Sequence, residues 1–243
     1  MKKLFLNLSL LAIFAVNAYP CFDTYLFLRK GSMVYPHKLS VLELNGEYSI
    51  NNVKNPQNDA FFSNGNFYYG LTQNFSIQLG VGSGEKPRGE FKVDTYIMRG
   101  VYNLFSSSTN DYTLDVIIEH VGQFDESQNE IGLSLPNIFH FSDLTYVLHP
   151  TTSYTLQEKN LTVGGHLGVF YDFNQTGIVG VGAEYASVQS SSYAGRRITQ
   201  SEVSTSLFFG AYIGKNIYFQ NEIAKGLANS RDFGFALTTK VIL

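Results

Sequence analysis

The chain has 243 residues, of which 44% are hydrophobic, 15% aromatic and only 15% charged, and its formal net charge is −3 at pH 7. The charged fraction is well below the ~25% that is usual for soluble domains, while the aromatic content argues against a disordered chain. The slightly acidic balance provides no basic field for nucleic acid. The single cysteine excludes an internal disulfide and a cysteine-based zinc site.

The first 18 residues predict a cleaved signal peptide for secretion. Two lysines, Lys2 and Lys3, precede an apolar stretch from Leu4 to Val16 and a small-residue cleavage site that ends at Ala18. This stretch is shorter than the ~20 residues of a membrane-spanning helix, and an N-terminal membrane anchor is the alternative. Residues 19–38 fit no clear element, and we expect them to pack in or under the structure that follows.

From residue 39 to the C-terminus, apolar side chains recur at every second position. This alternation is typical of a β-strand with one apolar and one polar face. The segments are long for globular strands and match the ~9–11 residues that a membrane-crossing strand needs. The clearest segments, in chain order, are residues 39–50, 69–82, 94–105, 112–120, 161–172, 177–187, 202–213, 217–226 and 233–243.

The stretch YGLTQNFSIQLGVG, residues 69–82, shows the pattern most plainly. A short turn at residues 72–74 is followed by a strand in which large apolar residues alternate with small or polar ones. The apolar residues are Phe75, Ile77, Leu79 and Val81, and the residues between them are Ser76, Gln78, Gly80 and Gly82.

Residues 130–157 are harder to interpret. Two further strands are expected near residues 130–141 and 144–157, although Pro136 and Pro150 weaken both because proline cannot donate a ladder hydrogen bond. With this pair the chain has about 12 strands, an even number that leaves both termini on the same side of a membrane. A barrel of about ten strands is the alternative.

The composition of the two strand faces indicates which face meets lipid. A soluble β-sandwich needs many charged groups on its polar face, whereas here that face is rich in Gly, Ser, Thr, Asn and Gln. Small residues of this kind suit the crowded inside of a barrel. Tyrosines near strand ends would form an aromatic girdle at the membrane surface. They are Tyr48, Tyr96, Tyr112, Tyr171 and Tyr185.

The sequence therefore predicts an all-β fold: a closed antiparallel transmembrane β-barrel of residues 39–243 in the outer membrane of a bacterial cell. Closing the sheet removes the edge strands, which lipid does not tolerate. A soluble secreted β-protein is the alternative.

Ten ionisable side chains are expected, by strand parity, to line the inside of this barrel. If they face water, the lumen is a narrow passive channel whose acidic, hydrogen-bonding lining favours cations or hydrogen-bonding solutes. If they pair with one another, the lumen is closed and the barrel is structural or binds a partner. The ten are Glu43, Glu47, Arg99, Asp115, Glu119, His166, Glu184, Glu202, Glu222 and Lys240.

A lipid hydrolase of the outer membrane is a third hypothesis. It needs a nucleophilic serine next to a histidine, and His166 has Ser204 and Ser206 two strands away as candidates. The chain has no G-x-S-x-G motif, and a histidine that is simply hydrogen-bonded in the lumen is the favoured interpretation. We therefore expect no enzyme activity, no metal site and no cofactor.

Two stretches resemble a known family. YYGLTQNFSIQLGVG, residues 68–82, is similar to the strand–turn–strand of bacterial outer-membrane barrels grouped with the transporters of the phenol-degradation meta-pathway. FGFALTTKVIL, residues 233–243, resembles the C-terminal strand that barrel-assembly machinery recognises, except that Leu243 stands where an aromatic residue is usual. The resemblance implies an envelope protein that acts as a passive channel for small molecules, and it identifies no cargo.

The expected partners follow from this location. They are outer-membrane lipid and lipopolysaccharide, the barrel-assembly machinery and a small-molecule solute, with no role for nucleic acid. Three longer polar connections, residues 51–65, 83–90 and 189–199, are expected to face outside. In the last of these, Arg196 and Arg197 could contact anionic lipopolysaccharide.

Overall fold

The fold is described from a computed structural model of the chain. The structure describes residues 27–28, 31–50, 59–87, 92–109, 111–125, 127–174, 176–187, 191–193, 196–198, 201–230 and 232–243. The predicted signal peptide lies outside these residues. Across the described part of the chain, no helix is long and apolar enough to cross a membrane.

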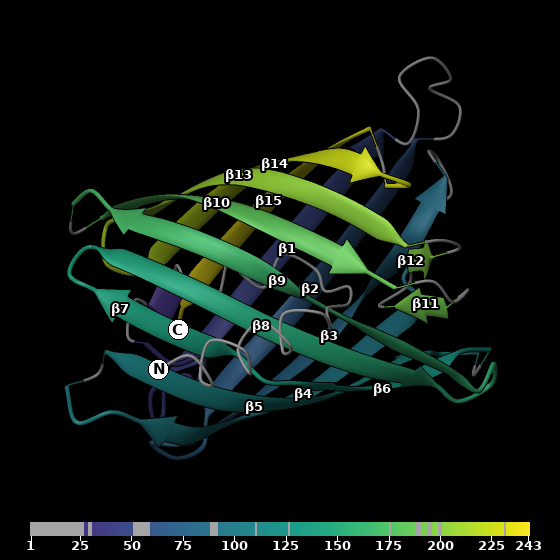
Figure 1. Ribbon diagram of the computed structural model, residues 1–243. Coiled ribbons are helices and arrows are strands. Elements are labelled where there is room, and N and C mark those ends of the chain that lie inside the picture. Colours follow the sequence, from purple (N-terminus) through teal and green to yellow (C-terminus); the bar gives the residue numbers. More distant parts are fainter. Residues whose placement is uncertain are drawn as a thin grey trace, which may run out of the picture.

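The described residues form a β-barrel whose strands follow one another in space as they do in sequence (Figure 1). The strands are β1 (Ser40–Ile50), β2 (Ala60–Gly70), β3 (Phe75–Pro87), β4 (Thr95–Ser106), β5 (Tyr112–Gln123), β6 (Asn129–Ser134), β7 (Asn137–Phe141), β8 (Leu144–Thr155), β9 (Asn160–Asp172), β10 (Gly177–Ala186), β11 (Ser191–Tyr193), β12 (Arg196–Ile198), β13 (Glu202–Ile213), β14 (Ile217–Ala228) and β15 (Phe233–Ile242).

The barrel closes between its first and last strands. β1 pairs antiparallel with β15, from Val41 opposite Ile242 to Ile50 opposite Phe233. β6 and β7 share one position in the wall, because both pair with β5 and both pair with β8. The wall of the described chain therefore has 12 strand positions, as predicted, with β11 and β12 forming a separate hairpin.

The two prolines of residues 130–157 have different effects. Pro136 lies between β6 and β7, and its carbonyl still accepts a hydrogen bond of 3.0 Å from the Asp115 amide. Pro150, by contrast, lies inside β8 opposite Gly165 of β9. A Cβ on Gly165 would collide with the His149 carbonyl, so glycine lets the two strands stay close beside the proline.

The two ends of the barrel differ in the length of their connections. We call the end with the C-terminus and the short turns 71–74, 107–111, 142–143, 173–176 and 214–216 the terminal end, and the opposite end the loop end (Figure 1). The predicted long connections 51–65 and 83–90 are wrong in part, because β2 begins at Ala60 and β3 runs to Pro87. Polar strand residues such as Asn64 pair in the wall and only look like loop in the sequence.

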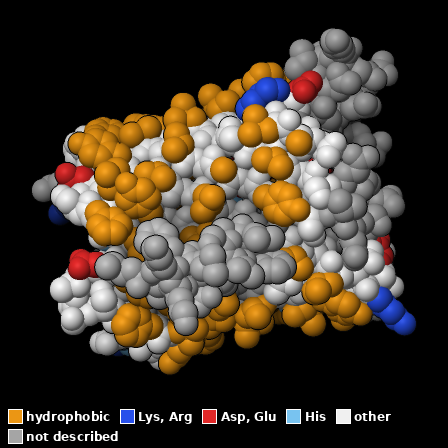
Figure 2. All heavy atoms as spheres, viewed as in Figure 1, with side chains coloured by type: hydrophobic (Ala, Val, Ile, Leu, Met, Phe, Trp, Pro, Cys, Tyr) orange, Lys and Arg blue, Asp and Glu red, His pale blue; other side chains and the backbone are white. Residues whose placement is uncertain are grey.

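Large apolar side chains cover the outside of the barrel. Figure 2 shows hydrophobic side chains spread over the outer face of the strands and the visible charged side chains near the two ends. In the middle of the wall, Leu44, Leu167 and Ile118 are each more than half exposed. An apolar surface of this extent is far larger than a soluble monomer leaves in water. The outer face is therefore built to contact lipid.

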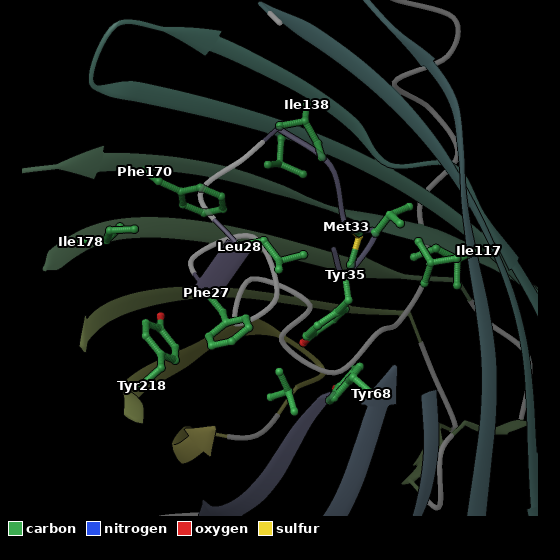
Figure 3. Packing of buried hydrophobic residues seen from close by; sticks show 14 of the residues in the cluster. Phe27, Leu28, Met33, Tyr35, Tyr68, Ile117, Ile138, Phe170, Ile178 and Tyr218 are labelled. Carbon is green, nitrogen blue, oxygen red and sulfur yellow. The ribbon is translucent and has the colours of Figure 1, made fainter. Parts of the chain in front are cut away.

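The inside of the terminal end is also apolar, which the alternation did not predict. Residues 27–28 and 31–38, here called the inner segment, enter the barrel and pack against a ring of strand side chains (Figure 3). From the inner segment come Phe27, Leu28, Met33, Val34 and Tyr35. From the wall come Val41, Tyr68, Val101, Ile117, Ile138, Val147, Phe170, Ile178, Phe208 and Tyr218. At this end the strands are therefore apolar on both faces.

Candidate functional site

The structure places all ten ionisable residues of the predicted lining on the inward face of the wall. Seven are buried: Glu43, Glu47, Asp115, Glu119, His166, Glu222 and Lys240. Arg99, Glu184 and Glu202 are half-buried. Their chain neighbours on the other face, such as Leu44 and Ile118, are exposed. The interior is thus the part of the molecule where polar chemistry is concentrated, and most of these charges fall into four groups.

The first group lies at the seam between β15 and β1. Lys240 Nζ is 2.6 Å from Glu43 Oε2, and both side chains are buried. The same carboxylate accepts hydrogen bonds from Asn66 Nδ2 at 2.5 Å and from Tyr68 OH at 3.0 Å. These bonds extend from β15 across β1 to β2. A buried ion pair is stable only with such additional partners, so a shared polar network holds the seam.

Aromatic rings surround the lysine of this group. The ammonium of Lys240 lies 4.7 Å from the ring centre of Tyr68, 5.4 Å from that of Phe27 and 5.8 Å from that of Tyr35. It also donates a hydrogen bond of 3.0 Å to Tyr35 OH. Because Phe27 and Tyr35 belong to the inner segment, this one cation contacts both the wall and the chain inside it, by charge and by cation–π attraction.

The second group fixes the inner segment on the other side of the lumen. The carboxylate of Asp115 on β5 accepts a hydrogen bond of 2.6 Å from the Met33 amide and a bifurcated bond from Ser32 Oγ, which is 3.0 Å from Oδ1 and 3.1 Å from Oδ2. Asn103 Nδ2 donates a further bond of 2.7 Å from β4. A carboxylate that accepts backbone and side-chain donors makes strong, charge-assisted bonds. Asp115 is therefore an anchor for the inner segment.

The inner segment also crosses the rim of the barrel at a glycine. Lys38 donates its amide to the Gly70 carbonyl at 2.8 Å, and the Gly70 amide donates to the Leu39 carbonyl at 3.0 Å. A Cβ on Gly70 would collide with the Pro36 carbonyl. Only glycine allows the chain to pass this closely over β2.

The third group is a pair of opposite charges on β4 and β5. Arg99 donates from Nε to Glu119 Oε2 at 2.7 Å, and its terminal nitrogen Nη2 bonds to the same oxygen. The two residues lie directly opposite each other in the strand register. Among the ten predicted residues, Arg99 and Lys240 are the two with a fixed positive charge, and each forms an ion pair with a carboxylate of the wall.

The fourth group runs across β8, β9, β10 and β13. The rings of His149 and His166 lie 5.2 Å apart, His166 Nδ1 is 3.6 Å from Glu184 Oε1, and Ser204 Oγ donates to Glu184 Oε2 at 3.4 Å. The carboxylate thus stands between the imidazole and the hydroxyl. A hydrolase needs the imidazole in the middle, hydrogen-bonded to the serine, so this arrangement does not have the order of a catalytic triad.

Three of the predicted residues lie apart from these groups. Glu47 on β1 and Glu222 on β14 both stand opposite Ala236 of β15, and Glu47 accepts a hydrogen bond of 3.2 Å from Ser49 Oγ. Glu202 begins β13 at the loop end. All three are acidic and lie on the loop-end side of the Lys240–Glu43 seam.

The loop end has a feature that sequence patterns did not suggest. The hairpin of β11 and β12 lies against two different parts of the wall, β11 against β8 and β12 against β3. In the order of pairing, β3 is far around the barrel from β10 and β13, which flank this hairpin in sequence. The connection that contains Arg196 and Arg197 therefore reaches across the mouth (Figure 1). The side chains of both arginines lie outside the described residues.

Sequence reasoning also missed the residues that hold the inner segment. Tyr35 lies in residues 19–38, which fitted no clear element. Tyr68 and Asn103 were read only as parts of strand segments, and Asp115 only as a lining charge. A signal was present, because Ile117 and Ile118 are consecutive apolar residues, as are Phe208 and Phe209. Two apolar faces on one strand indicate that something apolar also packs inside.

The described residues offer no group of three or more His, Cys, Asp and Glu side chains that could hold a metal ion. What the site provides is a wall of hydrogen-bonding groups and carboxylates around the axis of a barrel.

No protein-family model matches the chain, and no curated protein matches it in sequence. Its fold, however, is similar to that of several solved outer-membrane channels. The COG4313 outer membrane channel from Pseudomonas putida F1 matches with a TM-score of 0.66 at 10% identity, over 86% of this chain and 97% of that one. The NanC porin matches with a TM-score of 0.63 at 10% identity, over 83% and 100%. The KdgM porin in complex with disordered oligogalacturonate matches with a TM-score of 0.61 at 10% identity, over 83% and 98%. These likenesses show a fold shared with outer-membrane barrels.

Proposed function

We propose that the chain is a narrow passive channel for small solutes in the outer membrane of a bacterium. The observation that carries the proposal is that apolar side chains lie on the outside and polar ones on the inside, the reverse of their arrangement in a soluble protein. Apolar residues cover the outside of a closed barrel, while carboxylates, amides and hydroxyls line most of its inside. This arrangement suits a wall between lipid and an aqueous path. The fold shared with the COG4313 channel and the KdgM and NanC porins supports it.

The lining favours cations. Of the ten predicted residues, seven carry a carboxylate, and the two with a fixed positive charge are both held in ion pairs. The carboxylates Glu47, Glu202 and Glu222 lie towards the loop end, where a solute would enter. These acidic side chains lie on the nearby strands β1, β14 and β13, on one side of the lumen, and acidic groups there raise the local concentration of cations and repel anions.

The inner segment makes the channel narrow at its terminal end. Met33, Tyr35 and Phe27 occupy the axis there, and hydrogen bonds hold their backbone to the wall. The Met33 amide donates to Asp115 and the Tyr35 amide to Ser76, while the Phe27 carbonyl accepts from the Tyr212 hydroxyl. Solutes pass this end only beside the segment or when it moves. The position of the inner segment, the buried Lys240–Glu43 pair and the partly buried Arg99–Glu119 pair also favour a second candidate function, a permanently closed barrel with a structural or binding role.

The resemblance to transporters of the phenol-degradation meta-pathway is a finer proposal. The turn 71–74 that carries it connects β2 and β3 at the terminal end, where Leu71 and Thr72 both donate amides to the Phe75 carbonyl. We also propose lipid, lipopolysaccharide, the barrel-assembly machinery and a small solute as partners, and no enzymatic role.

Reconstitution in planar lipid bilayers tests the proposal. The folded chain is expected to give discrete current steps in potassium chloride. Under a tenfold salt gradient, the reversal potential should have the sign of a cation-selective pore. A barrel that inserts and stays electrically silent would favour the closed structural role, and an anion-selective reversal potential would contradict the acidic lining.

A further inference from the structure

A set of buried polar atoms at the loop end is not explained by the groups above. Among the described residues, the carboxyl oxygens of Glu130 and the hydroxyls of Ser153 and Thr155 have no hydrogen-bond partner of good geometry, although the Ser153 hydroxyl lies near enough to the Glu130 carboxyl to interact with it. All three residues are at least 97% buried. Buried polar atoms in native proteins almost always have partners, so such a group calls for an occupant.

The three side chains converge because of the strand register. Glu130 on β6 lies directly opposite Thr155 on β8, and Ser153 lies opposite Gly132, two residues further along β6. Side chains opposite each other on one face have Cβ atoms about 4.5–5.5 Å apart. Glu130 and Gly132 are buried, whereas Ile131 between them is nearly half exposed on the outer face. The carboxyl and both hydroxyls therefore point to the inside of the barrel.

The atoms offered by Glu130, Ser153 and Thr155 indicate which kind of ligand would bind there. It offers two carboxyl oxygens and two hydroxyl oxygens, and all four can accept a hydrogen bond. The nearby carboxylates of Glu119 and Glu158 disfavour a second negative charge at Glu130, so a cation beside this carboxyl would be favoured. An ammonium group has three N–H donors and no acceptor. It matches both the excess of acceptors and the negative charge of these carboxylates.

We propose that Glu130, Ser153 and Thr155 form a binding subsite for a small organic cation that carries a primary ammonium group. The proposal rests on the channel function and names a class of solute for it. The subsite lies where β6 begins and β8 ends, next to the loop end. A cation entering from that side meets Glu130 before it reaches the Arg99–Glu119 pair and the inner segment.

Binding is tested without requiring transport. The experiment is isothermal titration calorimetry of the full folded chain in detergent. The probe is n-butylammonium chloride, and tetramethylammonium chloride and 1-butanol are the comparison ligands. Tetramethylammonium has the charge but no N–H, and butanol has the chain but no charge. We expect both to bind at least tenfold more weakly than butylammonium. Equal binding of the two cations would show only a diffuse acidic field, and no binding of butylammonium would show a merely hydrated patch. Either result overturns the subsite.

Variants locate the binding. Glu130→Gln should weaken butylammonium binding at least tenfold, and the double variant Ser153→Ala, Thr155→Val should weaken it severalfold. The matched control is Asp125→Asn in the exposed turn before β6, which should change binding less than twofold. Glu130→Gln replaces a buried carboxyl by an amide of the same shape, and circular dichroism checks that each barrel folds. Unchanged binding in a folded Glu130→Gln barrel overturns the proposal.

The channel function is separated from the subsite by current recordings. Butylammonium added on the loop side should reduce the potassium current, and the half-blocking concentration should rise about tenfold in Glu130→Gln. If the chain carries no current, the channel proposal fails while the titration still decides the subsite. If it carries current and Glu130→Gln is blocked like the parent chain, the subsite fails while the channel stands.

Discussion

Lys240 and Glu43 form a buried ion pair across the seam where the last strand of the barrel meets the first, with 2.6 Å between Nζ and Oε2. The pair is joined to β2 through Asn66 and Tyr68 and to the inner segment through Tyr35. One contact thus couples closure of the wall to the position of the chain inside it.

Replacing Lys240 by methionine should destabilise the barrel by about 3–5 kcal/mol, because the Glu43 carboxylate is then left buried without its cation. The free energy of unfolding, measured by urea titration in lipid vesicles, reports the change. The control is Lys225→Met, which removes a half-exposed pair with Asp232 at 3.8 Å and should cost about 1 kcal/mol or less. Similar losses in the two variants would contradict the role given to the seam.

Replacing Asp115 by alanine should release the inner segment. The amide of Met33 and the hydroxyl of Ser32 lose their shared acceptor, and the segment then leaves the lumen more often. Arg29 and Lys30 are trypsin sites in this part of the sequence, and cleavage there should become at least tenfold faster in Asp115→Ala. Asp143→Asn, in an exposed turn of the same end, is the control and should be cleaved like the parent chain.

Adding one methyl group at Gly70 should also disturb the inner segment. The new Cβ collides with the Pro36 carbonyl, so the Gly70→Ala barrel either shifts its backbone or loses the bonds to Lys38 and Leu39. Each hydrogen bond contributes about 0.5–1.5 kcal/mol, and we expect a loss of about 1–3 kcal/mol in the urea titration. Gly46→Ala on β1, where a Cβ meets only ordinary contacts at 3.7 Å, should lose less. An equal loss at both positions would count against the close crossing.

The outer face provides a prediction that depends on depth. Ile118 lies in the middle of β5 and is 61% exposed, and Ile213 ends β13 and is 62% exposed. In a lipid bilayer, Ile118→Arg should lower the free energy of unfolding by about 2–4 kcal/mol, and Ile213→Arg should lower it by about 0–1 kcal/mol. Unfolding in vesicles measures both variants. If the two arginines cost the same, the outer face does not sit in a membrane as described.

The barrel itself could be predicted from the sequence, because one side of each strand has to meet lipid along its whole length. That constraint produces long, regular alternation, as in Phe75, Ile77 and Leu79, and it makes strand number and orientation readable. Even the strand interrupted at Pro136 was found, since the neighbouring strands require a partner at that position.

The contents of the barrel could be predicted only in part. The alternation along each strand predicts that Glu43, Arg99 and Lys240 point inward. The pairing of Lys240 with Glu43, however, depends on the register between the first and last strands, which lie at opposite ends of the sequence. The inner segment was harder still, because its contacts join residues such as Met33 and Asp115, which no local pattern connects.

Single-channel current compared between the full chain and Asp115→Ala tests the central claim, that the inside of this barrel is a conducting path which the inner segment narrows. The account predicts small cation-selective steps for the full chain and severalfold larger steps for Asp115→Ala in the same bilayers. If both barrels insert and fold but neither passes ions, the inside is not a path, and the channel account is contradicted.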